Sequence, residues 1–97
     1  MKSFALTKKA REDLLNIAIY TEARWGVNQR NFYIKQLDEA FHLLGKKPTL
    51  GKPCDEIKTG YRKFPQGMHV IFYKSGTSTK IEVIRILHKQ MDVDDKL

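Results

Sequence analysis

The sequence predicts an α+β fold, in which one strand, a helical hairpin and three further strands follow one another. This β–αα–βββ order implies an antiparallel sheet packed against an N-terminal helical hairpin. Three observations carry the prediction. Residues 8–45 repeat their apolar positions at helical spacing, with one glycine break at Gly26. Residues 61–89 read as three short strands separated by turn residues. The length of 97 residues, with 41% hydrophobic and 30% charged residues, suits one globular domain over residues 1–97.

The first strand and the first helix are expected in residues 2–25. Residues 2–6 suit a short strand, and Thr7 offers a side-chain oxygen that can cap the helix that follows. That helix ends at Gly26, because glycine adopts the left-handed conformation at little cost. Its apolar face is formed by Ala10, Leu14, Ile17, Ala18 and Thr21.

A second helix is expected over residues 28–45, after a short turn at Val27 and Asn28 and before a stop at Gly45. Its apolar stripe is formed by Tyr33, Ile34, Leu37, Ala40, Phe41 and Leu44. The short connection forces the two helices to run antiparallel as a hairpin. Each helix has one apolar stripe, so both are expected to pack on the sheet as well.

An irregular segment and an antiparallel meander complete the chain. Residues 46–60 hold two prolines and two glycines without a sustained period, which predicts a loop. The first strand of the meander is expected at 61–64, ending before Pro65, and the others at 68–74 and 80–89. In the middle strand the alternation places Met68, Val70 and Phe72 on one face and His69, Ile71 and Tyr73 on the other.

An arginine interrupts the apolar row of the last strand. Strict alternation places Ile81, Val83, Arg85 and Leu87 on the same face. If Arg85 faces outward, its apolar row neighbours are exposed too, and a sheet that is apolar on both faces suggests that a partner covers the second face. The alternative is a buried Arg85 paired with an internal carboxylate such as Glu56, because unpaired burial is costly.

Basic side chains cluster on neighbouring strands of the meander. The candidate functional groove consists of Arg62, His69, Arg85, His88 and Lys89. Two arginines can hold a phosphate group, and a histidine can transfer protons near neutral pH. Ordinary hydrogen-bonded histidines remain an alternative. The three histidines and the single cysteine fit no metal-ligand spacing, so no metal or other cofactor is expected.

Charge and cysteine content restrict the partners and the compartment. The formal net charge is +7, and residues 46–91 carry ten basic against three acidic residues, which favours an anionic partner or serves solubility alone. Cys54 is the one cysteine, so no internal disulfide can form and a reducing compartment is indicated. No apolar run is long enough to span a membrane and no secretion signal is evident, so a cytoplasmic protein is expected.

Four stretches carry a resemblance to a known family. The stretches "GYRKFPQGMHVIFYKSG" and "IEVIRILHKQMD" resemble the C-terminal half of ParE-type toxins of bacterial toxin–antitoxin pairs. The stretches "LTKKAREDLLNIAIYTEARWG" and "LLGKKPTLGKPCDEI" resemble the first helix and the linker of these toxins. The superfamily also includes RelE-type toxins, which cleave mRNA on the ribosome, whereas ParE-type toxins inhibit DNA gyrase. The resemblance therefore implies the β–αα–βββ fold and one of these two activities.

Departures from the nuclease pattern favour the gyrase branch. RelE-type nucleases carry a second basic residue where Phe64 stands here, and an arginine in the strand where this chain has His69. His88 could replace their C-terminal tyrosine or histidine, but no tyrosine follows Tyr73. The resemblance thus implies a gyrase inhibitor that is not an enzyme; the alternatives are a ribosome-dependent mRNA endonuclease and a basic nucleic-acid-binding module.

The resemblance also implies partners. A ParD-type antitoxin is expected to neutralise the toxin, and operator DNA is expected to be bound only through that antitoxin. The candidate antitoxin contacts are Tyr73, Ile81, Val83 and Leu87, the apolar strand residues expected beside the groove.

Overall fold

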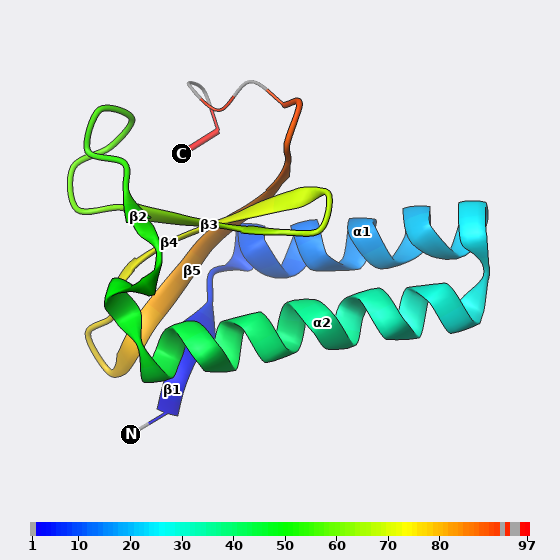
Figure 1. The fold of residues 1–97 in the computed structure, drawn as a ribbon, viewed down its shortest axis with the longest axis horizontal. Coiled ribbons are helices and arrows are strands. Elements are labelled where there is room, and N and C mark those ends of the chain that lie inside the picture. Colours follow the sequence, from blue (N-terminus) through cyan, green and yellow to red (C-terminus); the bar gives the residue numbers. More distant parts are fainter. Residues whose placement is uncertain (1, 92, 94–95) are drawn as a thin grey trace.

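A five-stranded sheet carries two antiparallel helices on one face (Figure 1). The computed structural model describes residues 2–91, 93, 96 and 97. Its elements are β1 (Lys2–Leu6), α1 (Lys8–Trp25), α2 (Val27–Lys46), a 3₁₀ turn (Pro48–Leu50), β2 (Lys52–Pro53), β3 (Arg62–Gln66), β4 (His69–Ser75) and β5 (Thr79–His88). The helical hairpin reaches beyond the strands at the end where α1 meets α2 (Figure 1). The predicted α+β class and the order of the main elements are confirmed.

The sheet has the order β1-β5-β4-β3-β2 and is not wholly antiparallel. The meander of β3, β4 and β5 is antiparallel, as predicted. β1, however, pairs with β5 in parallel, with Phe4 opposite Ile81 and Leu6 opposite Val83. The helical hairpin and the strands β2, β3 and β4 intervene, and they return the chain to β5 in the direction of β1. The expectation of a purely antiparallel sheet is therefore wrong.

Two glycines define the ends of the helical hairpin differently from the prediction. Gly26 alone joins the helices, with φ 94°, and α2 begins at Val27, so there is no two-residue turn. Gly45 does not end α2, which continues to Lys46. A Cβ at Gly45 would lie 2.5 Å from the Cβ of Ser3 and 2.8 Å from its carbonyl oxygen, so glycine permits α2 to pack directly on β1.

The segment between α2 and β3 is more regular than expected. It contains the 3₁₀ turn and the two-residue strand β2, which pairs with β3. Tyr73 holds the turn against the sheet, because its hydroxyl donates to the Pro48 carbonyl at 2.7 Å and accepts from the Gly51 N–H at 2.8 Å. β3 also continues through Pro65 to Gln66 instead of ending before the proline.

The main core lies between the hairpin and the sheet, as predicted. α1 contributes Ala10 and Ile17, and α2 contributes the stripe read from the sequence. The sheet supplies Ile71, Tyr73, Ile81, Val83 and Ile86, all of them at most 3% exposed.

A β-bulge in β5 breaks the predicted alternation. Phe72 is opposite Arg85 but Tyr73 is opposite Val83, so Ile84 is one extra residue in β5. Because one extra residue exchanges the two faces, Ile81 and Val83 face the hairpin whereas Leu87 belongs to the opposite face. The predicted common face for Ile81, Val83, Arg85 and Leu87 is therefore wrong.

The second face of the sheet is covered by the chain itself. Cys54, Phe72 and Leu87 form a small buried cluster there. Ile57 and Tyr61 from the 54–61 segment pack against it, as do Val93 and Leu97 near the C-terminus. The expectation that an external partner must cover this face is therefore wrong.

Candidate functional site

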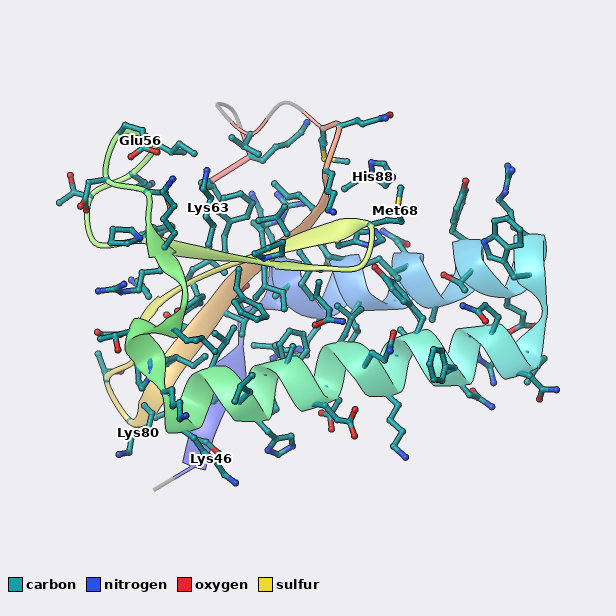
Figure 2. All side chains as sticks on the ribbon, viewed as in Figure 1. Lys46, Glu56, Lys63, Met68, Lys80 and His88 are labelled. Carbon is teal, nitrogen blue, oxygen red and sulfur yellow. The ribbon has the colours of Figure 1, made fainter. Side chains whose placement is uncertain are left out.

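A groove with a volume of about 920 Å³ lies between α1, the start of α2 and one end of the sheet. We call it the hairpin groove. Tyr20 and Trp25 line it at the hairpin end, and Asp13 and Arg85 line it at the end near the bulge. Met68 and His88 also line it, and Figure 2 shows these two side chains near each other at one end of the sheet. The groove therefore combines aromatic and thioether groups with a small polar cluster.

Arg85 is held by a carboxylate that the sequence reading did not single out. Its Nε and Nη2 donate to the two carboxylate oxygens of Asp13, at 2.7 and 2.8 Å. The Arg85 and Asp13 side chains are only 17% and 13% exposed. The hydrogen bonds to Asp13 raise the pKa of Arg85 and keep it charged. The alternative of an internal ion pair was right in kind, but the partner is Asp13 and not Glu56.

Asp13 also stabilises the bulge. Its Oδ2 accepts the N–H of Ile86 at 3.0 Å, one residue beyond Arg85. The sequence did contain a signal, because Asp13 lies three residues after Ala10 and four before Ile17, on the buried face of α1. A carboxylate on an apolar stripe needs a partner, and Arg85 is that partner.

The five predicted groove residues do not come together. His69, Arg85 and His88 line the hairpin groove, but Arg62 and Lys89 are not among its lining residues. Arg62 is opposite Tyr73 in the sheet, on the hairpin side, and its Nη1 donates to the Gly51 carbonyl at 2.7 Å. Arg85 is opposite Phe72, whose face is the other one. The two arginines therefore do not form a joint phosphate clamp.

The two histidines form a cross-strand pair. His69 is directly opposite His88, and their ring centroids are 5.5 Å apart with the rings nearly perpendicular. The Tyr33 hydroxyl lies 2.6 Å from His69 Nδ1. Burial, with a further contribution from His88, lowers the pKa of His69 to about 4. His69 is therefore uncharged near neutral pH and is a weak general base there.

The predicted antitoxin contacts lie inside the fold. Tyr73, Ile81, Val83 and Leu87 are 1%, 0%, 0% and 2% exposed. The expectation that they form exposed apolar surface is wrong, because the hairpin covers three of them and the chain's own 54–61 and C-terminal segments cover Leu87. Large exposed apolar side chains lie instead on the helical hairpin, where they include Tyr20, Trp25 and Phe32, and in the turn between β3 and β4, at Met68.

Two features are absent from the part of the chain that the structure describes. Within it, no group of three or more His, Cys, Asp or Glu side chains is placed to hold a metal ion. Neither helix of that part is long and apolar enough to cross a membrane.

Comparison with known proteins places this fold and sequence beside one group. Residues 4–93 match the family model described as the ParE toxin of the type II toxin–antitoxin system parDE. "Toxin ParE1" of Caulobacter vibrioides is 37% identical over 92 residues, covering 95% of this chain and 94% of that protein. "Toxin ParE1" of Mycobacterium tuberculosis is 39% identical over 94 residues, covering 97% and 96%. A solved structure, "Chromosomal ParDE TA system from P. aeruginosa", shares the fold with a TM-score of 0.74 at 19% identity, covering 91% of this chain and 96% of that one.

Proposed function

From the premise that the chain belongs to the ParE toxin family of type II toxin–antitoxin systems, we propose that it inhibits DNA gyrase by binding it and that a ParD-type antitoxin neutralises it. Gyrase is the target that the family resemblance implies. Operator DNA would then be bound through the antitoxin, and the toxin would act in the cytoplasm, where gyrase and its DNA are.

The state of Arg85 is the observation that supports binding over catalysis. Metal-free RNA cleavage needs cationic groups that are free to take up phosphate charge. Both oxygens of Asp13 already engage the Arg85 guanidinium, and Arg62 points to the other face of the sheet. His69 is also a poor base near neutral pH, because its pKa is about 4. Arg62, His69 and Arg85 therefore do not support the mRNA endonuclease alternative.

The hairpin groove is the proposed antitoxin site. Protein interfaces concentrate their binding energy in buried aromatic and arginine anchors, and the groove lining includes the aromatic residues Tyr20 and Trp25 as well as Met68 and Met91. Lys9 and Lys96 also line it, so carboxylates on the incoming segment would find cations. An acidic, amphipathic antitoxin segment fits this combination. Coupled folding of such a segment would bury well above roughly 1,600 Å² in total.

Two assays run side by side separate the two candidate activities. In a supercoiling assay with purified gyrase, micromolar toxin should block supercoiling, and a cognate ParD-type antitoxin should restore it. In a translation extract the same toxin should leave mRNA intact. Undisturbed supercoiling together with site-specific mRNA cuts would reject the proposal in favour of the endonuclease.

A matched pair of aromatic variants tests the antitoxin site. Trp25 and Phe32 are 65% and 57% exposed, but only Trp25 lines the hairpin groove. Trp25→Ala should weaken antitoxin binding by about 30-fold, the effect of losing a hot-spot side chain of about 2 kcal/mol. Phe32→Ala should change it little. Equal effects in titration calorimetry would show that the groove is not the site.

A further inference from the structure

The histidine pair at the end of the hairpin groove has a geometry that the proposed function does not use. His69 on β4 and His88 on β5 are direct cross-strand partners, so their side chains leave the same face of the sheet. Directly opposed residues have Cβ atoms about 5 Å apart. The rings are 5.5 Å apart between centroids, and both line the groove. Two imidazoles are thus held side by side at the wall of an open groove.

The Nδ1 atom of each ring is already engaged. His69 Nδ1 lies 2.6 Å from the Tyr33 hydroxyl, which also donates to the Gln66 carbonyl and accepts the Met68 N–H, each at 3.1 Å. Because the hydroxyl donates its single hydrogen to the Gln66 carbonyl, it can accept a hydrogen bond from Nδ1–H of His69, and in this tautomer Nε2 carries a lone pair. His88 Nδ1 accepts the Gln90 N–H at 3.2 Å.

The two Nε2 atoms are open. Neither makes a hydrogen bond to another residue that the structure describes. No buried side-chain nitrogen or oxygen in the described residues lacks a partner, so unpartnered Nε2 atoms must reach solvent. With Nδ1 as the acceptor from Gln90, the neutral ring of His88 carries its proton on Nε2, whereas Nε2 of His69 carries a lone pair.

We propose that His69 and His88 bind a first-row transition-metal ion such as Zn²⁺ through their Nε2 atoms. Neutral imidazole is a preferred ligand of Zn²⁺, Ni²⁺ and Cu²⁺, with Zn–N distances of about 2.0–2.1 Å. Water completes the coordination, since two protein ligands leave positions open. Mg²⁺ and Ca²⁺ require oxygen ligands. The carboxylate that lines the same groove, Asp13, is occupied by Arg85 and the Ile86 N–H.

The contacts of the two histidine rings with their neighbours differ in strength. The contact with Tyr33 fixes the ring of His69, as an outer partner does at many metal sites. Binding through Nε2 moves the remaining proton of His88 to Nδ1, so the exposed 3.2 Å contact with Gln90 is given up and that N–H turns to water.

Calorimetric titration of the full chain with Zn²⁺ tests the site, with His42 as a matched control. His42 lies on α2 and is not among the residues that line the hairpin groove. Its side chain is exposed, and its Nε2 lies 3.4 Å from Oδ2 of Asp38. We expect one Zn²⁺ per chain for the parent protein and for His42→Gln, and no heat from Mg²⁺. His69→Gln and His88→Gln should each weaken Zn²⁺ binding by at least about tenfold, with unchanged circular dichroism.

Nuclear magnetic resonance of the parent protein keeps the test independent of variant folding. Zn²⁺ should shift the imidazole signals of His69 and His88 and leave that of His42 in place. The proposal is overturned if millimolar Zn²⁺ moves neither signal, or if His42→Gln is the variant that loses binding. The gyrase proposal would be unaffected, because the metal site depends only on the geometry of the two histidines.

Discussion

Replacing Asp13 by alanine should destabilise the fold by about 3 kcal/mol. The change removes the two hydrogen bonds that the Arg85 guanidinium donates to Asp13 and leaves the one from Nη1 to the Lys96 carbonyl; it also removes the acceptor of the Ile86 N–H. Removing one partner of a buried ion pair costs about 3–5 kcal/mol. The 17% and 13% exposure of the two side chains leaves some solvent to screen the remaining charge, so the lower end applies. Loss of the acceptor for the Ile86 N–H also contributes, since a lost buried hydrogen bond costs about 1–3 kcal/mol. This cost is part of the total of about 3 kcal/mol.

Urea unfolding followed by circular dichroism measures the effect. With a denaturant slope of about 1–3 kcal/mol/M, the midpoint should fall by about 1–3 M. Asp13→Asn retains an acceptor for Ile86 without the charge and should give an intermediate loss. The double variant Asp13→Leu with Arg85→Met should recover most of the stability, because an apolar pair avoids the desolvation of two charges.

The neighbouring Glu12→Ala is the control. Glu12 is exposed on α1 and should change the free energy of unfolding by no more than about 0.5 kcal/mol. If Asp13→Ala also stayed within about 0.5 kcal/mol of the parent protein, Arg85 would not depend on Asp13. The guanidinium of Arg85 would then be available to bind a phosphate group.

The remaining predictions concern packing and pH. Gly45→Ala should lower the free energy of unfolding by about 1–3 kcal/mol, because the new Cβ would lie 2.5 Å from the Cβ of Ser3. In thermal unfolding, Tm should fall by about 4–8 °C for each kcal/mol lost. An unchanged Tm would mean that α2 does not pack tightly against β1. The pKa of His69 falls from 6.5 to about 4 on folding, so the unfolded state binds more protons between these values. The contribution of His69 to the free energy of unfolding is therefore fully present above pH 6.5 and should decline as the pH falls toward 4. In His69→Gln the urea midpoint should depend less on pH in this window than in the parent protein, whereas His42→Gln should behave like the parent. An equal pH dependence in both variants would contradict the role of His69.

Local signals in the sequence were enough to predict most of the fold. Thr7 caps α1 as its position suggested, with its hydroxyl accepting the Ala10 N–H at 3.0 Å. The helical stripes and the meander also follow from spacing alone. These features depend on residues that are neighbours along the chain or across a short turn.

The bulge at Ile84 could not be predicted in this way. It is flanked by contacts to residues more than 70 positions earlier: Thr7 Oγ1 donates to the Ile84 carbonyl at 2.9 Å, and Asp13 accepts the Ile86 N–H. Strict alternation has no signal for such an extra residue, and the bulge places Ile81 and Val83 on the opposite face of the sheet from Arg85 and Leu87. The errors at Ile81 and Val83 follow from this bulge. His69 and His88 were placed correctly because they lie where both strands reach the same end of the sheet.

The central claim is that this toxin stops gyrase by binding it and not by chemistry of its own. Titrating the toxin against a fixed amount of gyrase in a supercoiling assay tests that claim directly. A binding inhibitor should reduce supercoiling in proportion to the toxin-to-gyrase ratio and should reach its full effect only near stoichiometric amounts, with the His69→Gln and His88→Gln variants as potent as the parent. Complete inactivation of gyrase by a small fraction of its concentration would reveal catalysis, and no inhibition at any ratio would mean that gyrase is not the target; either result would contradict the account.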